Sequence, residues 1–400
     1  MHSLRSWSKH VSLSCIAALA LACGDDGSAS TGNADESGSE EGTTGTSAST
    51  GASATTQSSM DGTVGTTAMT ATTADTSGNP EDTGADSTGE ETGSAGIACL
   101  DEQFVAGISP VGNYSMFPDV PIGSHCQGTN QQDITGVERI VFVGDSVTVG
   151  TPPTGAGDFY RTILSEALAT AFGLEPPSGQ WENVNAIDGT AGVQESGAFA
   201  SCAVWGAQNG DLMGQLEGCF TPEQFALKTL VIFTMGGNDG ASIAKDYLDG
   251  AELADVLAEL DAMIAAHEMA VQWLTADNKF PNGVFVVNAD VYEFTDTTFD
   301  FQSCPTAGLA GFNSNPEMPE ILHSSLQHIN EEYMRIAEEN GTDVVFMSEG
   351  FCGHGFHAND AESACYRGPG NETWFDLTCI HPTPAGHGAL AEMFINTITE

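Results

Sequence analysis

Positively charged side chains are scarce in this 400-residue sequence, which has 9 lysines and arginines against 55 aspartates and glutamates. A chain this acidic is not expected to bind nucleic acid or an anionic membrane surface, because both would repel it. Long apolar runs are lacking as well, since the stretch from Val11 to Ala22 is too short to span a bilayer. Pairs of cysteines with zinc-finger spacing are also absent, and we expect neither a metal nor a cofactor.

The first 22 residues have the features of an export signal. Arg5 and Lys9 precede the apolar stretch, which ends in small residues and then Cys23. A cysteine at this point resembles the lipobox of bacterial lipoproteins, although Ala20 stands where leucine is usual. We therefore expect a lipoprotein signal peptide at residues 1–22 and lipid attachment at Cys23, which would be the protein's contact with the membrane. The expected location is the bacterial cell envelope, and ordinary secretion is the alternative.

Residues 23–96 are dominated by serine, threonine, glycine and acidic side chains, with no lysine or arginine. Such a segment buries too little apolar surface to offset its conformational entropy, so we expect a disordered tether. Residues 97–400 contain 42 acidic residues against seven lysines and arginines, and they are expected to form one acidic domain that acts as a monomer.

Eight cysteines follow the tether, and an even number in an exported chain predicts four disulfides. Pairing between neighbours closes the shortest loops and is preferred here, but the sequence does not decide among the connectivities. The preferred pairs are Cys99–Cys126, Cys202–Cys219, Cys304–Cys352 and Cys365–Cys379.

Apolar runs of strand length alternate with stretches of helical periodicity after residue 138. This alternation predicts an α/β fold in which a parallel sheet of about five strands is covered by helices on both faces. The expected strands are 139–143, 182–187, 229–234, 283–288 and 343–347. The expected helices are 158–172, 251–274, 319–340 and 384–398, with insertions near 289–318 and 350–373.

Chemically useful residues follow these apolar runs. Ser146 comes just after the first expected strand, in Gly-Asp-Ser, and Asn238 follows the strand 229–234 in Gly-Gly-Asn-Asp. Gly206 lies in Ala-Val-Trp-Gly-Ala, and His381 precedes the last expected helix. Because ligands bind at the carboxyl ends of parallel strands, we expect these residues to meet at one edge of the sheet.

The four motifs in this order resemble the SGNH, or GDSL-type, hydrolase family over essentially the whole of residues 139–398. The resemblance implies a flavodoxin-like, doubly wound sheet with Ser146 as nucleophile and His381 as general base. It also implies an oxyanion hole made by the backbone N–H groups of Ser146 and Gly206 and the side-chain amide of Asn238. The Gly-x-Ser-x-Gly motif of α/β-hydrolases does not occur around Ser146.

One position departs from the family pattern. An aspartate usually stands three residues before the histidine, and here Thr378 occupies that place. The acceptor that orients the imidazole is expected to be either the carboxylate of Asp376 or a backbone carbonyl such as that of Thr378. The role requires only an acceptor that holds the correct tautomer.

The expected function is hydrolysis of a carboxylic ester through an acyl-enzyme. The substrate could be a lipid, a short acyl ester or an O-acetyl group on a carbohydrate. The alternative from another class is an inactive surface binding protein that kept the fold. His354, His357 and Asp360 are weak metal candidates because they lie in a glycine-rich insertion. His387 is expected in the first turn of the last helix, and Asp145 and Asp239 are expected to support their turns.

Overall fold

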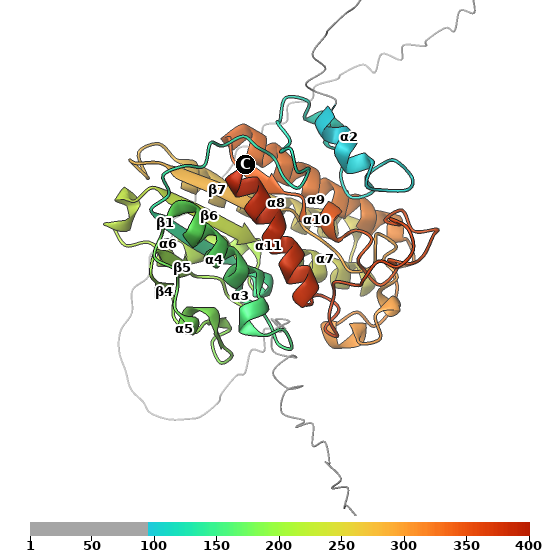
Figure 1. Cartoon of the computed structure of the whole chain (residues 1–400). Coiled ribbons are helices and arrows are strands. Elements are labelled where there is room, and N and C mark those ends of the chain that lie inside the picture. Colours follow the sequence, from blue (N-terminus) through green and yellow to red (C-terminus); the bar gives the residue numbers. More distant parts are fainter. Residues whose placement is uncertain (1–94) are drawn as a thin grey trace, which may run out of the picture. The chain divides into compact units, whose positions relative to one another are not determined.

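A six-stranded sheet forms the centre of the described part of the chain, residues 95–400 of a computed structural model (Figure 1). The expected signal peptide, the lipid-attachment residue Cys23 and nearly all of the expected tether lie outside the described residues. The strands are β1 (Arg139–Gly144), β2 (Val184–Asn185), β3 (Thr190–Ala191), β4 (Glu195–Ser196), β5 (Phe199–Ser201), β6 (Thr229–Thr234), β7 (Val284–Ala289) and β8 (Asp343–Val345).

Helices connect most of the strands. The α-helices are α2 (Ala95–Asp101), α3 (Ser146–Val149), α4 (Tyr160–Phe172), α5 (Gly179–Glu182), α6 (Leu212–Cys219), α7 (Gly237–Leu248), α8 (Leu253–Thr275), α9 (Pro319–Asn340), α10 (Met347–Phe351) and α11 (Pro384–Thr399). Short 3₁₀ turns are η2 (Tyr114–Met116), η3 (Ala156–Asp158), η4 (Asn209–Asp211), η5 (Gln224–Ala226), η6 (Phe301–Ser303) and η7 (Ala307–Ala310).

The strand order in the sheet is β4-β5-β1-β6-β7-β8, and all neighbours are parallel except the edge strand β4. Helices α4 and α11 cover one face, and α8 and α9 cover the other (Figure 1). The predicted α/β class with a mostly parallel, helix-covered sheet is therefore confirmed. Every residue of β1 and β6 is buried, as their uninterrupted apolar sequences predict for central parallel strands.

The expected second strand is wrong. Within 182–187 only Val184–Asn185 forms a strand, and it pairs with β3 in a separate two-stranded sheet. The place beside β1 belongs to β5, where Phe199 pairs with Ile140. The sequence-based assignment also did not include α7, which begins directly after β6.

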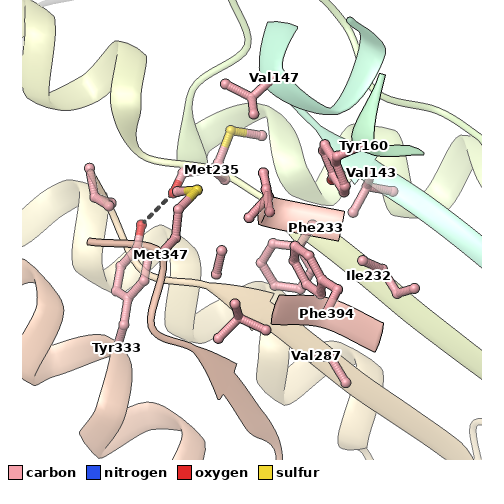
Figure 2. Packing of buried hydrophobic residues seen from close by; sticks show 14 of the residues in the cluster. Val143, Val147, Tyr160, Ile232, Phe233, Met235, Val287, Tyr333, Met347 and Phe394 are labelled. Atoms are coloured by element: carbon pink, nitrogen blue, oxygen red, sulfur yellow. Dashed lines mark hydrogen bonds between the residues drawn. The ribbon is translucent and has the colours of Figure 1, made fainter. Parts of the chain in front are cut away.

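The core lies on both sides of the central strands. Figure 2 shows Val143 of β1 and Ile232 of β6 near Tyr160 of α4 and Phe394 of α11. The rings of Tyr160 and Phe394 stack at a centroid distance of 5.5 Å. Burial of these large side chains is the main favourable term that holds the helices on the sheet.

Four disulfides are present, and two of the preferred pairs are confirmed: Cys99–Cys126 and Cys202–Cys219. The other two preferred pairs are wrong, because the bonds are Cys304–Cys379 and Cys352–Cys365. Loop length does not decide the pairing here, since Cys304–Cys379 closes the longest loop, with a separation of 75 residues. Four disulfides indicate an exported protein. None of the helices in residues 95–400 is both long and apolar enough to cross a membrane.

Candidate active site

The turn after β1 presents Ser146 at the carboxyl edge of the sheet. Gly144 ends the strand with φ 130°, and a Cβ there would lie 2.3 Å from the carbonyl oxygen of Thr234, so only glycine fits. Asp145 is the N-cap of α3 and accepts a hydrogen bond from the N–H of Val147 at 2.9 Å. Burial raises the pKa of Asp145 to about 7. Ser146 follows as the first residue of the short helix.

His381 reaches Ser146 from the other end of the sequence. Its Nε2 lies 2.9 Å from Ser146 Oγ, and each residue is only 4% exposed. The loop that carries His381 lies between β8 and α11, and the backbone of Phe375 pairs with that of Pro382 across it. Burial lowers the pKa of His381 to about 4, so the imidazole is neutral near pH 7 and can accept a proton.

Neither of the two expected acceptors forms a hydrogen bond with the imidazole in the described structure. Instead, the side-chain hydroxyl of Thr378 lies 2.8 Å from His381 Nδ1. The same hydroxyl donates to Asp376 Oδ1 at 2.6 Å, and the Thr378 N–H donates to that oxygen at 2.7 Å. Asp376 is therefore one hydrogen bond removed from the imidazole.

The two backbone N–H groups expected in the oxyanion hole, those of Ser146 and Gly206, have no hydrogen-bond acceptor among the described residues. Gly206 adopts φ 76°, in the left-handed region that favours glycine. Asn238, at the start of α7, donates one hydrogen of its amide to the carbonyl of Ala207 at 2.9 Å. This bond links the Gly206 loop to the helix and leaves the second amide hydrogen of Asn238 available.

The residues between β1 and α11 match a known family. The model of the GDSL-like lipase/acylhydrolase family matches residues 142–389, which is more than half of the chain. The chain belongs to this family. The GDSL domain thus includes both Ser146 and His381, and it is a hydrolase domain by family.

Three solved structures resemble the domain weakly. Phospholipase A1 from Streptomyces albidoflavus NA297 is 17% identical, with 65% of this chain and 98% of that chain covered and a TM-score of 0.40. The extracellular lipase from Streptomyces rimosus is 17% identical, with 64% and 98% covered and a TM-score of 0.38. A member of the lipolytic G-D-S-L family from Veillonella parvula DSM 2008 is 14% identical, with 66% and 98% covered and a TM-score of 0.38. Among curated protein sequences, none matches this chain.

An apolar pocket of about 130 Å³ opens at Ser146 and His381 of the GDSL domain. One wall is helix α7 with Asn238 and Ala241. Another part of the lining comes from the insertion that follows β7 and from α9, and its apolar side chains include Val291, Tyr292, Phe294, Phe299, Phe301, Phe312, Leu322 and Leu326. The pocket is therefore lined mainly by apolar side chains, with Ser146 and His381 among its few polar ones.

Supporting residues that the sequence alone did not single out hold the two glycine-containing turns. Gln215 of α6 clamps Gly144, accepting from its N–H at 2.7 Å and donating to its carbonyl at 2.8 Å. Asn209 ties its own loop to α7, because its N–H donates to the carboxylate of Asp239 at 3.1 Å. Both residues have amide side chains and lie within nine positions after Gly206 in the sequence. This proximity to a glycine motif is the signal that could have pointed to them.

His354, His357 and His387 form no hydrogen bond with Ser146 within residues 95–400. His387 lies in the first turn of α11, and its Nδ1 accepts a hydrogen bond from the N–H of Tyr160 at 3.2 Å. His357 Nδ1 lies 3.7 Å from Asp360 Oδ2. The ring of His354 stacks on that of Trp374, with 3.5 Å between the ring centroids. Within residues 95–400, no group of three or more histidine, cysteine or acidic side chains is arranged to hold a metal ion.

Proposed function

We propose that the protein is a serine ester hydrolase that cleaves esters with an apolar acyl chain. The observation that carries this proposal is the 2.9 Å contact between Ser146 Oγ and His381 Nε2 at the mouth of an apolar pocket. A lipid or a medium-chain acyl ester fits this pocket better than a carbohydrate O-acetyl group, because an acetyl group would leave most of the apolar lining in contact with water.

The reaction would proceed in two steps. Ser146 Oγ attacks the ester carbonyl carbon while His381 Nε2 takes the hydroxyl proton. The resulting oxyanion is stabilised by the N–H groups of Ser146 and Gly206 and the amide of Asn238. The tetrahedral intermediate then expels the alcohol, which receives the proton from His381. Water activated by the same imidazole attacks the acyl-enzyme, and the carboxylic acid leaves.

The location of the enzyme is part of the proposal. Residues 1–22 would be removed on export, and Cys23 would carry the lipid that holds residues 97–400 at the cell envelope on a long polar tether. Mass spectrometry of the N-terminal peptide would identify the acylated cysteine. We expect Cys23→Ser to release the enzyme into the medium with its activity unchanged.

A serine-directed organophosphonate tests whether the protein is an enzyme. We expect one equivalent to be incorporated, with the adduct on Ser146 in the peptide map. The variant Ser146→Ala should incorporate none and should retain the unfolding temperature of the parent. Absence of labelling in the parent protein would instead favour a binding protein that kept the fold.

The acyl preference can be changed at Ala241, which lines the pocket from α7. A phenylalanine at this position would fill part of the pocket. We therefore expect Ala241→Phe to lower kcat/KM for p-nitrophenyl octanoate by about 10-fold or more, with little effect on the acetate ester.

The matched control is Ala254→Phe, on an exposed position of α8. It should leave the ratio of the two rates unchanged. A parent enzyme that prefers acetate and acetylated xylan over longer acyl esters would contradict the proposed substrate class.

A further inference from the structure

Thr378 stands between the imidazole of His381 and the carboxylate of Asp376, at the position where the family pattern has an aspartate. We propose that Thr378 is a positioning residue whose hydroxyl selects the imidazole tautomer and connects His381 to the Asp376 carboxylate. The proposal rests on the proposed function, because it assigns the third component of the same site. This hydroxyl is neither of the two acceptors expected from the sequence, because neither the Asp376 carboxylate nor a backbone carbonyl forms a hydrogen bond with the ring.

The Thr378 hydroxyl has only one hydrogen to donate, and this fixes the direction of the hydrogen bonds from His381 through Thr378 to Asp376. A hydroxyl has one hydrogen to donate and two lone pairs that accept. An ionised Asp376 can only accept, so the hydroxyl hydrogen points to Oδ1, 2.6 Å away. One lone pair accepts from the N–H of His381 at 3.2 Å. The other is left for His381 Nδ1, which must therefore carry a hydrogen.

This arrangement decides which nitrogen faces the nucleophile. A neutral imidazole has one hydrogen, and the Thr378 contact places it on Nδ1. Nε2 then keeps its lone pair and points it at Ser146 Oγ, as a general base requires. Without the hydroxyl, the ring could hold its hydrogen on Nε2 and could not accept the serine proton.

The three residues are held in one short, buried turn. Asp376, Thr378 and His381 are 8%, 6% and 4% exposed. The N–H of Asp376 donates to the carbonyl of His381 at 2.9 Å, which closes the turn. Cys379 adopts φ 71° within it and is bonded to Cys304. The geometry is therefore set by the backbone and by a covalent link as well as by the side chains.

The hydroxyl also carries an electrostatic effect. When His381 accepts the serine proton it becomes an imidazolium, and its Nδ1–H then bonds to a hydroxyl that is polarised by a carboxylate. Burial raises the pKa of Asp376, and the hydrogen bonds from Thr378 oppose this rise. The Asp376 carboxylate thus stabilises the imidazolium through the Thr378 hydroxyl and not by a direct hydrogen bond.

Three variants test the proposal: Thr378→Val, Thr378→Ser and Asp376→Asn. Valine keeps the shape and removes the hydroxyl, so kcat for a p-nitrophenyl ester should fall about 10²-fold or more with KM little changed. Serine keeps the hydroxyl and should stay within about threefold of the parent. Asparagine keeps an acceptor oxygen but no charge, and it should lose about 10-fold.

The pH profile separates positioning from a purely structural role. In Thr378→Val and Asp376→Asn the imidazolium loses stabilisation, so the acid limb of kcat/KM should move to lower pH. Thr378→Ser should leave that limb in place. The matched control is Thr397→Val, because Thr397 is also 6% exposed and its hydroxyl has no hydrogen-bond partner within the described residues. It should change neither the rate nor the limb.

Two results would overturn the proposal. One is a Thr378→Val enzyme with the parent rate and an unshifted acid limb. The other is an equal decrease in kcat for Thr378→Val and Thr378→Ser, with an equal decrease in the unfolding temperature. Failure of the proposed function is a different result, since it would appear as full activity in Ser146→Ala or as absence of a phosphonate adduct on Ser146 in the parent.

Discussion

The side-chain amide of Asn238 has two hydrogens, and the proposed function uses both. One hydrogen is donated to the carbonyl of Ala207, which holds the neighbouring loop against α7. In the proposed mechanism the other is donated to the substrate oxyanion, together with the N–H of Gly206. Asn238 would then supply one donor and hold the loop that supplies a second one.

We expect Asn238→Ala to lower kcat by about 10²–10³-fold, because one preorganised oxyanion donor has that effect. The measurement is steady-state hydrolysis of a soluble p-nitrophenyl ester, with circular dichroism to show that folding is retained. The matched control is Asn282→Ala, whose amide also donates to a backbone carbonyl, that of Ala226, in an exposed loop. An Asn238→Ala enzyme as fast as the control would remove Asn238 from the oxyanion hole.

The buried imidazole predicts an enzyme that tolerates acid. In the proposed mechanism His381 must be neutral to accept the serine proton, and burial lowers its pKa from the usual 6.5 to about 4. Protonation removes the base, so kcat/KM should fall only as the pH drops below about 5. A pH–rate profile with a soluble ester checks this, and an acid limb centred near 6.5 would contradict it.

The sequence alone predicts that Ser146 and His381 lie together, as the structure shows, but not the hydrogen bonds around them. Ser146 and Asn238 could be located because each lies within four residues of the end of a strand whose apolar residues predict it. The role of Thr378 could not, because it depends on a six-residue turn in which Cys379 takes a left-handed conformation. A sequence pattern reports which residues are present and not which atom of a turn faces the ring.

At the scale of elements, the two segments that form the site are joined by a disulfide. Cys379 lies two residues before His381, and Cys304 lies in the insertion that carries Phe301 and Phe312. The hydroxyl of Thr306 also bonds to the carbonyl of Leu377 across the same junction. The loop that carries His381 and one wall of the apolar pocket are therefore covalently linked.

We expect the double variant Cys304→Ser, Cys379→Ser to lose about 10²-fold in kcat/KM, since small displacements of a reacting group have effects of this size. The matched control is Cys99→Ser, Cys126→Ser, because that disulfide lies in the segment that precedes β1. Activity and unfolding temperature should be measured for both. Equal activity losses in the two variants would show that the Cys304–Cys379 bond has no special role in the site.

Strands with long apolar sequences were predictable, and short ones were not. β1 and β6 each have six buried residues in a row, which is a strong signal. β5 has only three residues and follows the short antiparallel β4, so its sequence cannot be distinguished from that of a turn. The disulfides show the same limit, because Cys304 and Cys379 are close only after the insertion folds back on the histidine loop.

For the molecule as a whole, buried carboxyl groups link stability to pH. Asp290 and Glu349 are fully buried next to Tyr114 of η2, whose hydroxyl lies 3.0 Å from Asp290 Oδ2. Burial raises the pKa of Asp290 to about 6, and it raises the pKa of Glu349 well above its usual 4.5. Tyr114 belongs to the segment before β1, so this cluster holds that segment on the domain.

The sign of the pH effect follows from these shifts. Both carboxyl groups bind protons more tightly in the folded state than in the unfolded chain, so their contribution to stability is present at low pH and is lost as the pH rises through their folded pKa values. Their contribution to the free energy of unfolding should therefore decrease as the pH rises above about 4.5 and through the pKa of Asp290 near 6. We expect Glu349→Gln to lose part of this contribution. The measurement is the difference between the free energies of unfolding of parent and variant, obtained by urea unfolding at several pH values. Identical pH dependence in parent and variant would contradict this assignment.

The bond between Cys304 and Cys379 has a consequence for where the enzyme can work. A reducing cytoplasm keeps thiols reduced, so a newly made chain that has not yet crossed the membrane lacks the covalent link beside His381. We expect such a chain to be latent, and oxidation outside the cytoplasm would complete it. The producing cell would thereby keep its own internal esters out of reach of the enzyme until secretion had finished.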